Sequence, residues 1–194
     1  MALAHKPAEN QRAYRVFNAL DFDGDGFIDR ERLARALEII GFRRQDPRLA
    51  EVHGALEPLD GPALDFEGFR QVIAPASVLV ERAIRGAVAV PDFFTFRNQL
   101  QEMFEEVTHN RGGKPADYIP PLAAVNPEQF AVALVTVDGQ HLAVGDADVD
   151  FSIQSTCKPF NYCFALEELG EEAVHQHIGR EPSGQEFNAY VLQR

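Results

Sequence analysis

Apolar residues recur every three or four positions through the first half of the chain, which is the spacing of one face of an α-helix. The positions that follow this pattern are Tyr14, Phe17, Leu20, Leu33, Leu37, Ile40, Leu49, Val52, Leu56, Phe69 and Ile73. Gly41 follows the second group, and Asp46 and Asp65 precede later ones, as is typical of helix ends and N-caps. The sequence therefore predicts a series of short helices.

The longest predicted helix begins at Asp92. Its apolar positions fall on one side of the helix and are Phe93, Phe96, Leu100, Met103, Phe104 and Val107. Because large apolar side chains are usually buried, we expect this phenylalanine-rich stripe to pack in a core.

The pattern changes after Asn110-Arg-Gly-Gly113, whose composition predicts a linker. Residues 130–137 read as a β-strand, Asp138-Gly139 as a hairpin turn and residues 141–144 as the partner strand. Two further helices are predicted, over residues 155–169 and 172–178. An isolated two-stranded hairpin is only marginally stable in water, so this part of the chain offers little sheet of its own.

The segment from Asp21 to Asp29 resembles the calcium loop of an EF-hand. Asp21, Asp23, Asp25 and Asp29 stand at loop positions one, three, five and nine, where oxygen ligands are expected. Position twelve, a bidentate glutamate in a calcium-binding loop, is Arg32 here. We expect these four aspartates to bind calcium only weakly.

A second loop precedes the segment from Leu64 to Phe69. It lacks the alternating carboxylates of a calcium loop and has Gly68 at its twelfth position. EF-hands occur in pairs, so the two loops together predict a paired EF-hand-like unit with a structural role.

Ser155 and Lys158 stand three residues apart near a predicted helix start, where Pro159 is tolerated. A serine hydroxyl is a poor nucleophile until a base removes its proton, and a lysine one helical turn away can reach it. The free N–H groups at this helix end would stabilise an oxyanion. The same spacing also fits an N-cap serine followed by a solvated lysine.

Further motifs surround this pair in a fixed order. They are residues 113–123, 130–139, 144–146, 151–155 and 179–188. Together they resemble the serine-dependent glutaminases, which have a β-lactamase-like catalytic domain. The resemblance covers Gly112 to Arg194 closely. Residues 46–49 and 90–94 extend it to the helical domain that precedes the catalytic domain in animal kidney-type glutaminases.

The resemblance implies hydrolysis of L-glutamine to L-glutamate and ammonia through a glutamyl-serine intermediate. It implies that Ser155 attacks the side-chain amide, Lys158 accepts the serine proton and Tyr118 relays protons to the leaving ammonia. The side chain of Gln154 would help to hold the substrate. Tyr118 could instead be a packed aromatic residue. No cofactor is required, and we expect the full-length protein to be a homo-oligomer, either a dimer or a tetramer.

The expected fold class is multidomain, α followed by α/β. Residues 1–110 would form an EF-hand-like helical bundle, and residues 111–194 the first part of a β-lactamase/transpeptidase-like domain. In the resembled family much more catalytic domain follows, so we expect the chain to be the N-terminal portion of a glutaminase. The groups that grip the amino-acid end of glutamine should lie beyond Arg194, and the 194-residue chain itself should lack activity.

Composition excludes several classes of partner. The formal charge of −12, without a basic patch, argues against nucleic acids and anionic membranes. No apolar run approaches the length of a membrane span. Cys157 and Cys163 lie six residues apart on one predicted helix, too far for a relaxed disulfide. We expect both to be reduced, buried thiols in a cytoplasmic protein.

The histidines and two other protein classes complete the sequence-based picture. We expect His141 beside the hairpin turn to be exposed, and His175 and His177 to be solvated rather than to bind a metal. A penicillin-recognising acyl-enzyme shares the serine and lysine, but its later Ser-x-Asn and Lys-Thr-Gly elements are not in this sequence. A non-catalytic, calcium-responsive EF-hand-like module remains the other alternative, and it rests on the N-terminal loop.

Overall fold

The computed structural model describes residues 6–182, Gly184 and Gln185. The chain divides into two compact units, Met1–Asp148 and Val149–Arg194. Of the motif residues named above, Ser183 and residues 186–194 lie outside the described part. The domain boundary predicted after residue 110 stays a prediction. The structural division falls later in the chain because the hairpin is hydrogen-bonded to the helices before it.

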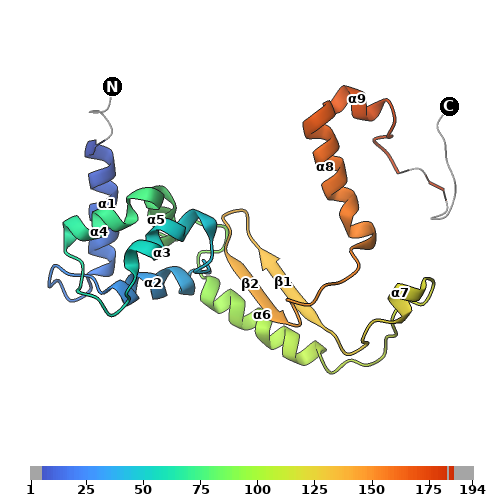
Figure 1. Ribbon diagram of the computed structural model, residues 1–194, viewed down its shortest axis with the longest axis horizontal. Coiled ribbons are helices and arrows are strands. Elements are labelled where there is room, and N and C mark those ends of the chain that lie inside the picture. The colour runs from blue at the N-terminus through green and yellow to red at the C-terminus, as the bar shows by residue number, and fades with distance from the viewer. Residues whose placement is uncertain (1–5, 183, 186–194) are drawn as a thin grey trace. The chain divides into compact units, whose positions relative to one another are not determined.

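The first unit begins with the α-helices α1 to α6 (Figure 1). Their bounds are α1 Lys6–Leu20, α2 Arg30–Ile39, α3 Ala50–Leu56, α4 Phe66–Ile73, α5 Ser77–Ile84 and α6 Phe93–Val107. The N-caps predicted from aspartates are confirmed, because Asp46, Asp65 and Asp92 each accept a hydrogen bond from a backbone N–H of the following turn. Helix α5 was not predicted from the sequence.

The core of these helices is built from the predicted apolar positions. Phe17, Leu33, Leu37, Phe69 and Ile73 are all buried in one cluster. An antiparallel bridge between Ile28 and Leu64 joins the two EF-hand-like loops, with N–H···O distances of 2.9 and 2.8 Å. This bridge holds the beginnings of α2 and α4 in a fixed pair, and so it sets the shape of the Asp21–Asp29 loop.

The stripe on α6 is buried only at its start. Phe93 is 2% exposed, whereas Met103 and Val107 are 58% and 50% exposed, so the prediction of a fully packed stripe is wrong. The reason is that the C-terminal half of α6 extends beyond the helical core to the hairpin (Figure 1). There Phe104 stacks on Phe130 with ring centroids 5.0 Å apart.

The predicted hairpin is present. Strands β1 (Ala131–Val135) and β2 (His141–Gly145) pair antiparallel, with Ala133 opposite Ala143. The short helix α7, Pro120–Ala123, precedes it. Gly145 has φ +74° and lies against the Phe104 ring and the Phe130 carbonyl, where a Cβ atom would clash. In the described residues this two-stranded sheet is the only one.

The second unit contains a short 3₁₀ turn, Gln154–Cys157, that leads into α8 (Lys158–Leu169) and then α9 (Glu171–His175). Cys157 and Cys163 are free, but Cys163 is exposed, so the prediction of two buried thiols is wrong. The sides of α8 are largely open in the described part of the chain. Within those residues, no helix combines the length and apolar character needed to cross a bilayer.

Candidate functional site

The proposed nucleophile and base lie three residues apart, one helical turn from each other. Ser155 is in the 3₁₀ turn, and Lys158 begins α8 with its backbone N–H donating to the Ser155 carbonyl. Pro159 falls in the first turn of α8, where its missing N–H costs nothing. Both Ser155 and Lys158 are exposed in this structure. The backbone thus places the two side chains on one side of the helix start.

The backbone is strained directly before the serine. Among the described residues, Gln154 is the one non-glycine residue with a positive φ, 45°. That conformation is unfavourable for a residue with a Cβ atom, and it persists where surrounding structure or function requires it. The Gln154 amide donates to the Ser152 hydroxyl at 3.0 Å. Ser155 therefore directly follows a residue whose backbone conformation is energetically unfavourable.

Tyr118 occupies a different part of the chain. It is 70% exposed and lies in the bend before α7. Tyr118 belongs to the first compact unit, whereas Ser155 and Lys158 belong to the second. Ser155 and Lys158 share one helical turn, and the catalytic roles of these two residues and of Tyr118 stay predictions.

A pocket of about 910 Å³ adjoins Lys158 within the second unit. It is bounded by Tyr162 on α8 and by His175 and Arg180 after it. The Tyr162 hydroxyl lies 3.0 Å from His175 Nε2, and His175 Nδ1 lies 3.0 Å from the Ile178 carbonyl. His175 is therefore held by two partners, and the prediction of a solvated ring is wrong. The local sequence gave no signal of this pairing.

The Asp21–Asp29 loop gathers carboxylate oxygens that could hold a cation. Ligand oxygens of Asp21, Asp23 and Asp25 lie within 4.8 Å of one another. The Gly26 N–H donates to Asp21 at 3.1 Å, and the Phe27 N–H donates to Asp25 at 2.8 Å. Asp21 Oδ1 is buried without a hydrogen-bond partner in the described residues. These residues fit an oxygen-ligated cation as far as the first five loop positions.

Arg32 changes the electrostatics of that loop. Its guanidinium lies 3.6 Å from Asp23 Oδ2 and 3.8 Å from Asp29 Oδ2, and it donates to the Leu20 carbonyl at 3.3 Å. Desolvation acts to raise the pKa of Asp23, but hydrogen bonds within the loop and the charge of Arg32 lower it. The positively charged side chain of Arg32 thus occupies the loop position at which a calcium-binding loop has a glutamate.

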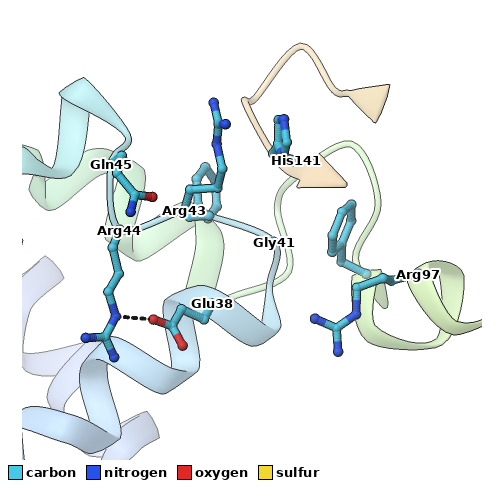
Figure 2. Close-up of a pocket in the computed structure, with 9 residues that line it drawn as sticks. Glu38, Gly41, Arg43, Arg44, Gln45, Arg97 and His141 are labelled. Carbon is cyan, nitrogen blue, oxygen red and sulfur yellow. Dashed lines mark hydrogen bonds and ion pairs between the residues drawn. The ribbon is translucent and has the colours of Figure 1, made fainter. Parts of the chain in front are cut away.

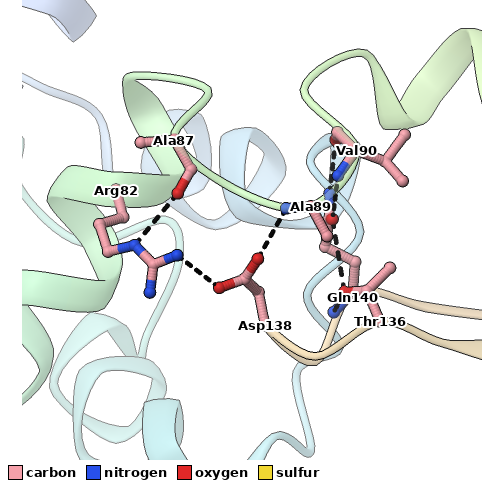
Figure 3. A network of polar contacts seen from close by, with 7 residues as sticks. All are labelled: Arg82, Ala87, Ala89, Val90, Thr136, Asp138 and Gln140. Atoms are coloured by element: carbon pink, nitrogen blue, oxygen red, sulfur yellow. Dashed lines mark hydrogen bonds and ion pairs between the residues drawn. The ribbon is translucent and has the colours of Figure 1, made fainter.

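The tip of the hairpin forms a polar junction with the helices (Figure 3). Gln140 is completely buried, and its amide N–H groups donate to the carbonyls of Ile40 and Val90 at 2.7 and 2.8 Å. Its side-chain oxygen accepts from the Val90 N–H at 3.0 Å. Asp138 accepts from Arg82 and from the Ala89 N–H, each at 2.6 Å.

His141 lies beside this junction. Its backbone N–H donates to the Gly41 carbonyl at 2.8 Å, and its side chain is half-buried, so the prediction that it is exposed is wrong. Polar residues at a hairpin turn ordinarily face water, and nothing in the local sequence indicates partners 50 and 100 positions away. Sequence reasoning therefore missed Asp138, Gln140 and His141.

Two segments of the chain match models of known protein families. Residues 113–194 match the family model of the glutaminases, and residues 13–91 match the model of an EF-hand domain. The first match contains the Ser155–Lys158 turn and the hairpin, and the second contains the paired loops.

Individual relatives agree with these matches. The chain is 35% identical over 175 residues to the mitochondrial liver isoform of glutaminase from Mus musculus, covering 88% of this chain and 29% of the relative. It is 30% identical over 201 residues to putative glutaminase 3 of Caenorhabditis elegans, covering 98% and 34%. It is 56% identical over 93 residues to the thermolabile glutaminase of Rhizobium etli, covering 47% and 30%. The chain thus spans about a third of the length of these relatives.

Proposed function

Since residues 113–194 belong to the glutaminase family and follow an EF-hand domain, we propose that the protein contributes the first part of a catalytic domain that hydrolyses L-glutamine. The products are L-glutamate and ammonia. The observation that carries this proposal is the Ser155–Lys158 turn, with the strained Gln154 before it, inside the matched segment.

The proposed reaction proceeds through a serine acyl-enzyme on a β-lactamase-like domain. Ser155 attacks the side-chain amide carbon of glutamine, and Lys158 takes the hydroxyl proton. Tyr118 passes a proton to the leaving amine, so that ammonia departs and the glutamyl-serine ester remains. Water then hydrolyses the ester and releases glutamate. The backbone N–H of Ser155 stabilises the oxyanion in both steps, and Gln154 helps to hold the substrate.

Ammonia release from glutamine, by a protein that carries the whole glutaminase domain, tests these roles. Ser155→Ala should abolish turnover, because it removes the hydroxyl that forms the ester, while Ser77→Ala in the helical domain should leave it unchanged. Lys158→Arg should be nearly as damaging, because a guanidinium does not give up its proton. Lys114→Arg is the matched control.

Tyr118 has a separate test in the same assay. Tyr118→Phe should slow turnover by a factor of roughly 10²–10⁴, the usual contribution of one acid–base group. Tyr14→Phe, on the exposed side of α1, controls for the loss of a phenol. A normal rate in Tyr118→Phe would give this residue a packing role, and a normal rate in Ser155→Ala would end the serine mechanism.

The reaction requires no cofactor in this proposal. Asp21, Asp23, Asp25 and Asp29 would hold calcium in a structural role, and the nearby Arg32 guanidinium supports weak binding only. When bound, calcium would supply positive charge that draws these carboxylates together.

The remaining proposals concern partners and location. We propose a homo-oligomer, a dimer or a tetramer, for the full-length protein. The two free cysteines support a cytoplasmic location for this chain. The mouse relative carries the word mitochondrial in its name. Cell fractionation with antibodies against the protein distinguishes the two locations.

A competing function class uses the same serine and lysine on penicillins. Turnover of nitrocefin by the whole catalytic domain, without turnover of glutamine, would favour that class. The glutaminase match over residues 113–194 supports the opposite outcome. A non-catalytic calcium-responsive module would give neither activity and no covalent labelling of Ser155 by a glutamine analogue.

A further inference from the structure

A tyrosine and a histidine form a hydrogen-bonded pair in the pocket beside Lys158. The Tyr162 hydroxyl on α8 lies 3.0 Å from His175 Nε2, and His175 Nδ1 lies 3.0 Å from the Ile178 carbonyl. The two rings meet edge to face, with centroids 6.0 Å apart. Both side chains line the pocket of about 910 Å³ that Lys158 also lines. The serine mechanism proposed above gives neither of them a task.

The Ile178 carbonyl determines the direction of both hydrogen bonds. A carbonyl oxygen only accepts, so His175 Nδ1 carries the hydrogen that is donated to it. In a neutral imidazole the other nitrogen then has a lone pair and no hydrogen, so His175 Nε2 accepts from the Tyr162 hydroxyl. The hydroxyl hydrogen therefore points to His175. The Tyr162 oxygen, with its lone pairs, is the part of the hydroxyl that can accept a hydrogen bond from another group in the pocket.

The turn between α8 and α9 places His175 next to Tyr162. Gly170 has φ +79°, a conformation that glycine adopts without a steric penalty, and its N–H donates to the Leu166 carbonyl at 3.0 Å. The chain reverses there and continues into α9, where Val174 is 3% exposed. The histidine that follows Val174 thereby reaches a tyrosine 13 positions earlier in the chain.

Helical spacing relates Tyr162 to the proposed base. Tyr162 stands four residues after Lys158 on α8, so the two side chains lie on the same face of the helix. A lysine that has given up one proton keeps two hydrogens and one lone pair on its amine. To act as a base on Ser155, the amine must direct that lone pair at the serine hydroxyl. An acceptor that takes one of the amine hydrogens limits the directions in which the lone pair can point.

We propose that Tyr162 and His175 are positioning residues for Lys158, an inference that rests on the serine mechanism proposed above. His175 accepts the hydroxyl hydrogen of Tyr162, the Tyr162 oxygen accepts a hydrogen from the Lys158 amine, and the lone pair of that amine faces Ser155. Tyr162 and His175 keep their own protons throughout, and the proton that moves is that of Ser155, which passes to Lys158. The pair raises the rate because it holds a flexible side chain in its reactive orientation.

Steady-state ammonia release by a protein that carries the whole glutaminase domain tests this role. Tyr162→Phe should lower kcat by about tenfold to a hundredfold, because it removes the acceptor for the lysine amine. KM should change by less than about twofold, since the pair does not contact glutamine in this proposal. His175→Leu should have the same effect. His175→Gln should restore most of kcat, because its amide offers an oxygen to the Tyr162 hydroxyl and an N–H to the Ile178 carbonyl.

Matched variants separate this inference from the proposed function. Tyr14→Phe, which removes an exposed phenol from α1, should leave kcat unchanged. A normal kcat in Tyr162→Phe, together with an inactive Ser155→Ala, overturns the positioning role and leaves the serine mechanism intact. Turnover that survives Ser155→Ala overturns both. Equal losses of kcat in His175→Gln and His175→Leu would show that the ring only packs α9 against α8, which also overturns the positioning role.

The position of the hydrogen on the His175 ring gives a readout that needs no activity. Nitrogen resonances of the imidazoles in the 194-residue chain, recorded at about pH 8, where histidines are ordinarily neutral, should show the His175 hydrogen on Nδ1. Tyr162→Phe should shift the Nε2 resonance of His175. The reference imidazole is that of His141, which lines a pocket of the first unit (Figure 2) and should not respond. A hydrogen on His175 Nε2 would reverse the bond to Tyr162 and overturn the proposal.

Discussion

Gln140 illustrates how one buried polar residue can determine the position of a whole hairpin. Its side chain uses both amide hydrogens and its carbonyl oxygen on backbone groups of two distant loops. Its backbone carbonyl accepts a hydrogen bond from the Thr136 N–H at 2.9 Å, and its backbone N–H donates to the Thr136 hydroxyl at 3.0 Å. A buried polar group without a hydrogen-bond partner costs free energy. The hairpin is therefore favoured in the one position against the helices in which all of these groups are paired.

We predict that Gln140→Leu destabilises the protein by roughly 2–4 kcal/mol, because it leaves the carbonyls of Ile40 and Val90 and one N–H without partners. Leucine has a similar volume, so lost packing contributes little. Urea unfolding followed by far-ultraviolet circular dichroism measures the change. Gln99→Leu, on the exposed side of α6, should stay within about 0.5 kcal/mol. Equal stability of the two variants would contradict the role given to Gln140.

Glu81 carries the second residue-scale prediction. It is 9% exposed and accepts hydrogen bonds from Arg15 at 2.6 and 3.1 Å, with Arg12 and Arg85 at 3.3 and 3.6 Å. The bond from Arg15, ahead of the charges of the other two arginines, lowers the pKa of Glu81 below its usual 4.5. Its folded-state pKa is thus depressed relative to the unfolded chain.

A depressed carboxylate pKa stabilises the fold above the unfolded value and loses that contribution as the pH falls through the folded value. Glu81→Gln should therefore cost about 1–3 kcal/mol at pH 7, and the difference from wild type should shrink as the pH falls below 4.5. Unfolding curves at several pH values measure this. A difference that persists unchanged far below pH 4.5 would contradict the ion-pair explanation, and Glu102→Gln provides the exposed control.

At the scale of elements, the paired loops show how a helix start can be arranged without a bound metal. Arg32 stands one turn into α2 and reaches back to Asp23 and Asp29, where calcium would otherwise balance the carboxylates. The bridge between Ile28 and Leu64 then fixes the two loops independently of any ion. We therefore expect the shape of the helical domain to depend little on calcium.

We predict that the wild-type chain binds calcium no more tightly than about 10⁻⁴–10⁻³ M, the weak end of the EF-hand range. Arg32→Glu should tighten binding by about tenfold or more, because it removes a cation and adds two ligand oxygens. Arg35→Glu makes the same charge change outside the loop and should have little effect. Calorimetry measures both, and micromolar binding by the wild type would show that another group already completes the site.

The elements themselves were largely predictable, and their docking was not. Aspartate caps and helical periodicity predicted α2, α4 and α6. Two strand-like segments separated by an Asp-Gly turn predicted the hairpin. Helix α5 was not predicted, because its first turn carries no capping side chain and follows a 3₁₀ turn that contains Pro75. At the candidate site, the spacing of Ser155 and Lys158 was evident, whereas the Tyr162–His175 pair depends on how α9 folds back on α8.

At the scale of the whole molecule, the proposed catalytic residues lack the enclosure that acid–base chemistry needs. Ser155 and Lys158 are exposed, and Tyr118 is 70% exposed. Enzymes enclose their reacting groups to exclude water and to hold them in position. We therefore expect one helical turn alone to be insufficient for turnover.

We predict that the 194-residue chain alone releases no measurable ammonia from glutamine, whereas a protein with the whole glutaminase domain does. A coupled assay for ammonia compares the two at equal concentration. Activity of the 194-residue chain that disappears in Ser155→Ala would contradict this prediction. Activity that survives Ser155→Ala would point to a contaminating enzyme, so that variant is an essential control.

The polar junction at the hairpin tip also bears on how such genes can recombine. The two family matches leave residues 92–112 between them, which invites a crossover that exchanges one domain for another. Asp138 and Gln140 lie after that crossover, yet Ala89 and Val90, which complete their hydrogen bonds, lie before it. A chimera joined there would take Asp138 and Gln140 from one parent and the loop that contains Ala89 and Val90 from the other. A crossover after Asp148 would keep both sides of these hydrogen bonds from the same parent.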